Sequence, residues 1–268
     1  MELEVLKQLQ NAEFEILLAL DDFCRLNDIE YSLYAGTMLG AVRHHGFIPW
    51  DDDIDVAMTR EEYSKFCRTI LEKPMDGFFF ENYETNTNCG TCHGKLRKLG
   101  TIFLQKGEIE GKGHHELWVD IFPLDKYALN KDGEKARWIG RQNVFLTRAN
   151  VGNVMDSRKK RIVRFLIRLI PVWFRHRVLI YNTRWLEKNS IATNDNYYWM
   201  SMSTLENIDR YRFPQDICEE YDNLEFNGHQ FRIFKKYKEM LSHLYCDYMI
   251  LPPVEERVCS HNPIKIVF

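Results

Sequence analysis

Apolar residues recur at helical spacing in residues 4–24, with charged residues between them, which predicts an amphipathic helix. Residues 29–35 are rich in aromatic and β-branched side chains, and residues 53–58 alternate between polar and apolar side chains, so both segments favour strands. A short helix is expected between them at residues 37–42. The chain therefore opens with a helix and then interleaves strands with helices.

Thr59 is followed three residues later by Glu62, a capping box that predicts a helix running to about Glu72. Further strands are predicted at residues 78–83, at residues 94–104 around Gly100, and at residues 117–122, where Pro123 ends the strand. We therefore expect an α/β (α+β) fold, with a mixed β-sheet flanked by helices.

The second half of the chain is more helical. Residues 130–190 favour helices with one basic flank, and the last part combines a short strand at residues 231–234 with a helix near residues 236–246. At 268 residues the chain fits one enzyme domain with additions. We divide it into a catalytic core (1–128), a helical, basic, membrane-associating insertion (129–210) and C-terminal elements that complete the same domain (211–268).

Composition and charge narrow the class of protein. The formal net charge of −3 argues against a surface matched to nucleic acid. The N-terminus lacks the basic segment and uninterrupted apolar run of a signal peptide, and no run approaches the roughly 18–20 apolar residues of a spanning helix. Seven scattered cysteines are expected as reduced thiols. These features favour a cytoplasmic protein, and they leave its oligomeric state open.

Four carboxylates crowd into a short segment after Trp50, at Asp51, Asp52, Asp53 and Asp55. Two aspartates at alternate positions of a strand project from the same face roughly 6.5–7 Å apart, and their repulsion costs about 2–2.5 kcal/mol at an effective dielectric near 20. A divalent cation, Mg²⁺ or Mn²⁺, would offset this repulsion.

We expect a third carboxylate ligand for such an ion on a neighbouring strand. Asp120 lies between apolar residues, as a strand residue that points into a pocket would. For Asp51 and Asp52 the alternative is a solvated acidic loop, or a role as additional acidic ligands. Upstream, Gly36 and Thr37 would let the backbone approach a phosphate at the start of the following helix.

The string GTMLGAVRHHGFIPWDDDIDVAM, residues 36–58, resembles the hallmark of the LicD family, within the nucleotidyltransferase fold superfamily. The resemblance continues at KLRKLGT (95–101), VDIFPLD (119–125) and CDYMILPPVEER (246–257), so it touches nearly the whole chain. The chain departs from the commoner family string at Met38, where Leu is usual, and at Cys246, where Gly is common.

The resemblance implies a nucleotidyltransferase-like fold in which Asp53, Asp55 and Asp120 are the catalytic and metal-binding carboxylates. It likewise implies that Gly36 and Thr37 form the phosphate-binding turn. Members of the family are known or proposed phosphocholine transferases and related phosphotransferases that act on cell-surface glycans.

Several basic and aromatic residues are candidates for the donor substrate. Arg43, Lys95 and Arg97 are suited to donor phosphate, because Arg in particular binds phosphate in a planar, bidentate way. Tyr34, Trp50 and His44 are candidates for contacts with choline or the nucleotide, since aromatic faces attract quaternary ammonium groups. The alternatives are solvated basic side chains on a strand or helix and aromatic side chains packed in the core.

Cys89, Cys92 and His93 match the C-x-x-C-H string of haem attachment, but that chemistry requires export. A zinc site built on the two cysteines lacks a second ligand pair at the usual spacing. We therefore interpret both as loop cysteines.

A basic stretch follows at residues 158–177, where apolar residues recur on one helical face among Arg and Lys. Helices of this kind bind anionic membrane surfaces, which would bring a lipid-linked acceptor within reach. The alternative is a helix that packs its apolar face into the domain and presents its charges to water.

The resemblance to the LicD family implies the transfer of phosphocholine from CDP-choline to a hydroxyl of a cell-surface glycan precursor of the teichoic acid or lipopolysaccharide type, with release of CMP. One alternative is the transfer of a ribitol, glycerol or sugar phosphate from another CDP-linked donor. A non-catalytic, membrane-recruited binding module is an alternative of another class. An RNA nucleotidyltransferase is disfavoured by the acidic charge balance.

Overall fold

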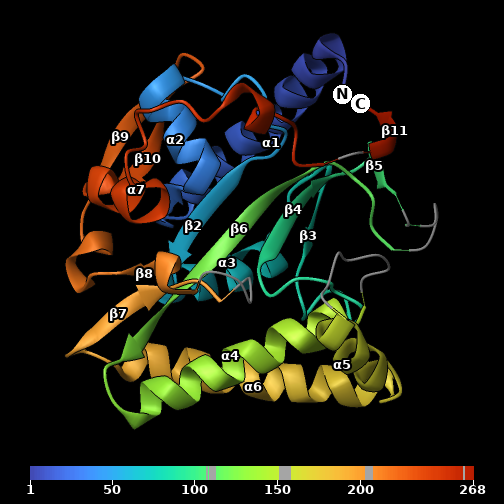
Figure 1. Ribbon diagram of the computed structural model, residues 1–268, viewed down its shortest axis with the longest axis vertical. Helices are drawn as coiled ribbons and strands as arrows, with labels where there is room; N and C mark the ends of the chain where they lie inside the picture. The colour runs from blue at the N-terminus through green and yellow to red at the C-terminus, as the bar shows by residue number, and fades with distance from the viewer. Residues whose placement is uncertain (107, 109–112, 151–157, 203–207, 262) are drawn as a thin grey trace.

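A mixed β-sheet organises the molecule (Figure 1). The computed structural model describes residues 1–106, 108, 113–150, 158–202, 208–261 and 263–268. Within these residues the sheet has seven strands, with β1, β2, β6, β4 and β3 in that spatial order, β7 paired with β6, and β8 paired with β7. Only β2 and β6 pair in parallel; the other pairs are antiparallel. The strands are β1 Ser32–Leu33, β2 Asp55–Thr59, β3 Phe78–Glu81, β4 Gly94–Lys98, β6 Trp118–Ala128, β7 Tyr197–Met200 and β8 Arg212–Phe213.

Helices flank this sheet, which confirms the predicted α/β (α+β) fold. The helices α1 and α3 pack against the central strands, and α4 and α6 pack together against β6 on the lower side of Figure 1. Thr59 caps α3 by accepting the Glu62 amide, as the sequence predicts. The helices are α1 Leu3–Leu26, α2 Ala35–His44, α3 Arg60–Glu72, α4 Lys131–Arg148, α5 Arg158–Arg168, α6 Val172–Ala192 and α7 Tyr237–Tyr245.

The prediction that Pro123 ends its strand is wrong, since β6 continues to Ala128. On one side of β6 the partner β4 reaches only Ile121, and β7 takes over from Asp125. Pro123 lies in the gap between these two partners, where the amide hydrogen that proline lacks is not needed for the ladder. The long β6 therefore connects the two ends of the molecule.

The single strand predicted around Gly100 is in fact two strands. Gly100 has a φ of +85°, a left-handed conformation that breaks the extended run between β4 and β5 (Ile102–Gln105). Strand β5 pairs with the C-terminal strand β11 (Pro263–Val267) instead of the central sheet. The end of the chain thus returns to the body of the molecule.

A hairpin lies next to β1, the strand at one edge of the sheet (Figure 1). It consists of β9 (Tyr221–Phe226) and β10 (His229–Phe234), joined by Asn227 and Gly228, both with positive φ as a two-residue turn requires. The Phe234 amide donates a hydrogen bond to Ser32 Oγ of β1 (2.9 Å). Short 3₁₀ turns at Ile208–Tyr211, Gln215–Cys218 and Val254–Glu256 complete the C-terminal part.

The main hydrophobic core lies between α1, the central strands and the hairpin. It contains Leu9, Ile16 and Leu17 of α1 together with Val119 and Ile121 of β6, all inaccessible to solvent. A smaller, separate cluster lies under α4, α6 and β7. The main core packs against the first part of β6, and the smaller cluster packs against its last part. The start of β6 also lies beside the acidic segment.

Candidate active site

Acidic side chains from two neighbouring strands meet where β2 and β6 begin. In the parallel pairing Asp55 is the direct partner of Asp120, and the Asp120 amide donates a hydrogen bond to the Ile54 carbonyl (2.9 Å). Asp53 lies two residues before Asp55, directly ahead of the strand. The fold thus brings carboxylates that are far apart in the sequence to one end of the sheet.

Asp120 is surrounded by hydrogen-bond donors. Lys95 Nζ lies 2.6 Å from Asp120 Oδ1, His93 Nε2 lies 2.8 Å from the same oxygen, and Trp118 Nε1 donates to Oδ2 (2.8 Å). Burial alone would raise the pKa of Asp120, but Lys95 and then His93 hold this pKa well below its usual range. Asp120 is therefore ionised at neutral pH.

The other carboxylates show the opposite shift. Burial, followed by the charges of Asp53 and Asp120, raises the pKa of Asp55 well above its usual value. Burial and then Asp53 do the same to the pKa of Asp51. Burial also raises the pKa of Asp53, although His261 opposes this shift. This end of the sheet thus carries an excess of negative charge that its own cations do not neutralise.

This carboxylate row (Asp51, Asp53, Asp55 and Asp120) fits a hard divalent cation, because Mg²⁺ and Mn²⁺ prefer oxygen ligands and would offset the repulsion. Asp53 and Asp55 would bind the ion, with Asp51 beside them. The Asp120 oxygens already contact Lys95, His93 and Trp118, so Asp120 would bind the ion in addition to these partners. Among the described residues, no three His, Cys, Asp or Glu side chains form a ready-made metal-binding group. The fit therefore rests on the unbalanced charge.

Asp52 differs from its neighbours in the acidic segment. Its buried side chain accepts hydrogen bonds from the amides of Ser260 (3.0 Å) and His261 (2.9 Å), and its Oδ1 lies 3.3 Å from His261 Nδ1. Asp52 therefore anchors the C-terminal segment beside the site. The alternative of a solvated acidic loop is wrong for Asp52, which is buried, and Asp51 is half-buried.

The first turn of α2 positions the start of β2. Thr37 Oγ1 accepts a hydrogen bond from the Asp55 amide (2.8 Å). A Cβ on Gly36 would lie 2.8 Å from Asp51 Oδ2, so only glycine leaves room for that carboxylate. No side chain caps α2, and its first amides are the donors that a phosphate would use. The expected phosphate-binding turn is therefore the first turn of the helix itself.

One cavity opens beside Gly36 and Asp51, with a volume of about 660 Å³. Trp50, Tyr245 and Tyr248 contribute aromatic side chains to its wall, and Asp247 and Glu256 contribute carboxylates. We call this the aromatic cavity.

Basic residues of α2 and the C-terminal segment border the aromatic cavity. Arg43 Nη1 donates to the carbonyls of Tyr248 (2.9 Å) and Ile250 (3.3 Å), so it ties the C-terminal segment to α2. The His44 ring lies edge-on to Trp50, and the Arg257 guanidinium lies 5.5 Å from the centre of the Trp50 ring. The indole thus already attracts a cation in this chain.

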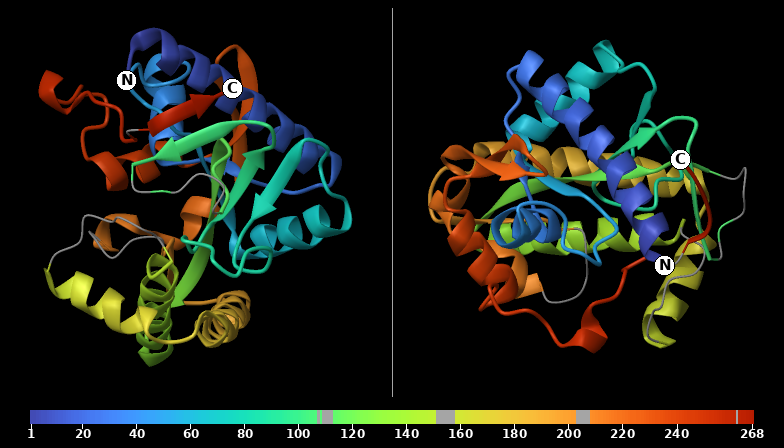
Figure 2. Two further views of the ribbon diagram at one scale, coloured as in Figure 1. Left: turned by 90° about the vertical axis from the view of Figure 1, so that its right-hand side faces the viewer. Right: turned by 90° about the horizontal axis from the view of Figure 1, so that it is seen from above.

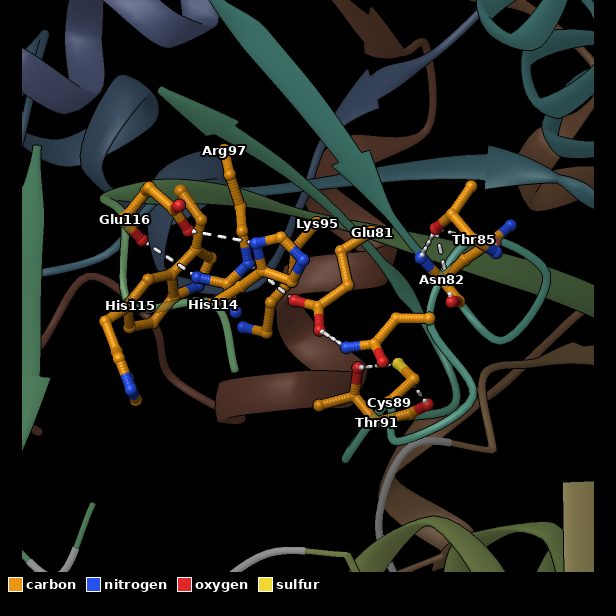
Figure 3. Close-up of polar contacts among 12 residues, drawn as sticks. Glu81, Asn82, Thr85, Cys89, Thr91, Lys95, Arg97, His114, His115 and Glu116 are labelled. Carbon is orange, nitrogen blue, oxygen red and sulfur yellow. Dashed lines mark hydrogen bonds and ion pairs between the residues drawn. The ribbon is translucent and has the colours of Figure 1, made fainter. Parts of the chain in front are cut away.

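A second cavity of about 590 Å³ is lined by Lys95, the partner of Asp120, and we call it the polar cavity. Figure 3 shows the side chains of Lys95, Arg97, Glu81 and His114 gathered around this space. Arg97 is buried, pairs with Glu81, and donates to the Glu116 carbonyl (2.8 Å). Lys95 lies 4.1 Å from the centre of the Trp118 ring. The cavity therefore combines cationic, amide and aromatic groups.

Of the other candidates, Tyr34 lies in the core beneath the site. Its ring packs against Phe122 and Phe213, and its amide donates a hydrogen bond to the Asp55 carbonyl (3.0 Å). Tyr34 therefore supports β2 from below and lines neither cavity.

Sequence reasoning missed several residues at the site, among them His261 and the cavity residues Tyr245 and Tyr248. His93 and Trp118 contact Asp120, and they alternate with Lys95 and Asp120 along β4 and β6, a signal that the sequence already contains. Glu13 is buried behind the carboxylate row, and burial followed by the charge of Asp53 raises its pKa well above its usual value. A charged residue inside the apolar stripe of a helix is the signal that could have found it.

The C-x-x-C-H string contributes only its histidine to the site. Cys89 Sγ donates to the Thr91 carbonyl (3.4 Å), and Cys92 Sγ lies 3.5 Å from Thr147 Oγ1. All seven cysteines are free. Both cysteines therefore act as local packing and hydrogen-bonding groups.

The mixed sheet carries its carboxylates at the start of the parallel strand pair, which is the arrangement that the resemblance to nucleotidyltransferases implies. Residues 28–148 match the family described as "LicD/FKTN/FKRP, nucleotidyltransferase domain". This domain of the chain belongs to the LicD family, and it contains all of the carboxylate row together with Lys95 and His93.

Individual relatives extend this similarity. The lipopolysaccharide cholinephosphotransferase LicD of Haemophilus influenzae is 28% identical over 255 residues, which cover 89% of this chain and 89% of that protein. An uncharacterized protein of Rickettsia typhi is 36% identical over 64 residues, 24% of this chain and 21% of its own. One of Rickettsia prowazekii is 53% identical over 36 residues, 13% and 14% of the two chains.

Proposed function

We propose that this protein transfers phosphocholine from CDP-choline to a hydroxyl of a cell-surface glycan of the lipopolysaccharide type. The observation that carries the proposal is the aromatic cavity directly beside the carboxylate row. Its wall combines Trp50, Tyr245 and Tyr248 with acidic side chains, and a quaternary ammonium group binds best to aromatic faces near negative charge. The similarity to a cholinephosphotransferase along most of both chains supports the same donor.

The two cavities suit the two ends of the reaction. The choline group would occupy the aromatic cavity, and its phosphate would lie at Gly36, where the first amides of α2 are close to the carboxylate row. The polar cavity, with Lys95 and the amide side chains of Asn86 and Gln105, would bind the hydroxyl-rich acceptor. Donor and acceptor would then meet at Asp53 and Asp55.

The reaction is a displacement at phosphorus. The acceptor hydroxyl oxygen attacks the phosphorus that carries choline, the bond from that phosphorus to the CMP oxygen breaks, and CMP leaves with the electron pair. A carboxylate of the row takes the hydroxyl proton. Lys95 and His93 lower the pKa of Asp120, so Asp120 is a weak base and is better suited to hold charge. A divalent ion, when bound, would neutralise charge on the donor phosphates.

A donor assay tests the proposal. Purified protein is incubated with lipopolysaccharide and CDP-choline, CDP-glycerol or CDP-ribitol, with Mg²⁺ or Mn²⁺, and CMP release is measured. We expect turnover of CDP-choline with label transfer to the glycan. Asp53→Asn and Asp55→Asn should each lower kcat about a thousandfold, whereas the exposed Asp22→Asn on α1 should leave it unchanged.

Two other outcomes would contradict parts of the proposal. Consumption of CDP-glycerol or CDP-ribitol with CDP-choline untouched would reject the choline donor and retain the transferase. Equal CMP release by wild type and Asp53→Asn would reject catalysis at the carboxylate row and favour a binding module.

The aromatic cavity has its own test. Trp50→Ala should raise the KM for CDP-choline about tenfold with little change in kcat, because the ring would contact the choline group and not the reacting phosphorus. Trp138→Ala, which removes an exposed indole on α4, is the matched control. An unchanged KM in Trp50→Ala would exclude Trp50 from the choline site.

A further inference from the structure

The helix α5 exposes its apolar side chains to solvent and buries one of its arginines. Ile162, Phe165, Leu166 and Leu169 recur at helical spacing and are between 54% and 68% exposed, whereas Arg164 of the same helix is buried. Arg168 Nε donates to the Ala149 carbonyl at the end of α4 (2.9 Å). The apolar face of α5 therefore points outward, and this overturns the alternative in which that face packs into the domain.

The exposed apolar surface continues into α6. Trp173 is 63% exposed and Phe174 is 48% exposed, just after the end of α5. Figure 2 shows α5 projecting from the body of the molecule beside α4 and α6. We call these residues the apolar patch: Ile162, Phe165, Leu166, Leu169, Trp173 and Phe174. A contiguous patch of this kind on one protein surface marks an interaction site.

Positive charge accompanies the apolar patch. Lys159 and Arg161 of α5 are exposed, and an open groove along α6 is lined by Arg177, Arg184 and Lys188. Trp173, Arg177 and Lys188 fall on one stripe of α6, because separations of about four and eleven residues are close to one and three helical turns. The sequence has no acidic residue from position 157 to position 186. The surface formed by α5 and the first part of α6 therefore combines exposed apolar side chains with basic ones.

From this arrangement we propose that the apolar patch docks onto an anionic lipid surface. Phe and Trp side chains at the patch would enter the boundary between headgroups and acyl chains, while Arg177, Arg184 and Lys188 would lie among the phosphates. In the described part of the chain, no helix is both long and apolar enough to cross a membrane. The contact is therefore peripheral.

The docking surface adjoins the polar cavity. Asn150 lines that cavity, and its Oδ1 accepts a hydrogen bond from Arg175 Nη1 near the start of α6 (2.8 Å). On the proposed function, a membrane-docked enzyme would receive a lipid-linked glycan directly into the polar cavity. Docking itself does not depend on the reaction, so the two can be tested separately.

Vesicle flotation tests the docking. Wild-type protein is mixed with vesicles of pure phosphatidylcholine or with vesicles in which about a third of the lipid is phosphatidylglycerol. We expect strong binding to the anionic vesicles that weakens with salt. Phe165→Ser with Leu169→Ser should lower partitioning about tenfold or more, and Arg177→Gln should lower it about fivefold on anionic vesicles only.

Matched controls lie far along the chain from α5 and α6. Leu26→Ser replaces an exposed leucine at the end of α1, and Lys7→Gln removes an exposed charge. Both should bind as wild type, and all variants should keep wild-type CMP release from CDP-choline with a soluble acceptor. Vesicle binding by the Phe165/Leu169 variant equal to that of wild type would overturn the proposal. So would a wild-type dimer in solution that this variant dissociates without any vesicle binding by either protein.

Discussion

The strand pair β2 and β6 carries buried charge at both of its ends, and the two ends differ. At the far end, Arg60 and Asp125 form a buried, bidentate ion pair, with both nitrogen–oxygen distances at 2.7 Å. At the near end, burial and the charges of neighbouring carboxylates raise the pKa values of Asp53 and Asp55, and too few cations lie among them. One end is electrically balanced, and the other is not.

This difference separates a structural use of charge from a functional one. The Arg60–Asp125 pair satisfies both partners and joins α3 to β6, so it needs nothing from outside. Asp51, Asp53 and Asp55, by contrast, keep raised pKa values that the protein itself does not relieve, as expected of a site that binds a cation or a proton. The same two strands thus carry an ion pair that is neutral within the protein and a group of carboxylates whose charge is not neutralised.

Breaking the balanced end should have the largest effect on stability. Asp125→Ala would leave the Arg60 guanidinium buried without its partner, and we expect the free energy of unfolding to fall by about 3–5 kcal/mol. Urea denaturation followed by circular dichroism measures this change. Glu15→Ala removes the partner of Lys98 in an exposed pair and should cost less than about 1 kcal/mol. Equal losses in the two variants would contradict the comparison.

The sequence predicted the near end of the strand pair better than the far end. Asp53, Asp55 and Asp120 follow from local alternation and from the resemblance to a family, and both signals lie within short segments. The long run of β6 past Pro123 could not be predicted, since it depends on where β4 stops and β7 begins. Local propensity does not contain that information.

The partners of the site show the same limit. Lys95 was placed by its chemistry, but its contact with Asp120 depends on the register between β4 and β6. His261 reaches Asp52 only because the C-terminal strand β11 pairs with β5. Such pairings join segments distant in sequence, so one sequence read alone predicts the types of residue at the site and few of their neighbours.

The unbalanced end should show itself in the pH dependence of stability. The folded-state pKa values of Asp51, Asp53 and Asp55 are raised, so the folded protein binds more protons than the unfolded chain above about pH 4. Stability is then present at acidic pH and is lost as pH rises through the folded-state values. We expect metal-free protein to lose about 1–2 kcal/mol between mildly acidic and mildly alkaline pH.

Other groups at the site do not reverse this sign. Burial alone would lower the pKa of His261, but its hydrogen bond to Asp52 and the charges of Asp53 and Asp52 together raise it, so its contribution is also lost as pH rises. The pKa of Asp120 is lowered, and its contribution is complete above about pH 4. Asp53→Asn should flatten the dependence of the free energy of unfolding on pH, whereas Asp22→Asn should leave it unchanged. Mg²⁺ should raise the stability of the wild type most at alkaline pH. A flat wild-type profile would show that the charges at this end are balanced after all.

The smallest effect concerns the backbone that leads into the unbalanced end. Ala35 has a φ of +44°, a left-handed conformation that costs an L-residue about 1–2 kcal/mol and that glycine adopts freely. Ala35→Gly should therefore stabilise the protein by about 0.5–1 kcal/mol. Ala41→Gly, in the right-handed part of the same helix, should destabilise it by about 1 kcal/mol. Thermal denaturation of both variants measures the difference, and a loss of stability in both would show that Ala35 carries no strain. If Ala35→Gly also lowers CMP release, the left-handed turn serves to hold Gly36 and Thr37 against the carboxylate row, and the unbalanced end stores backbone strain as well as charge.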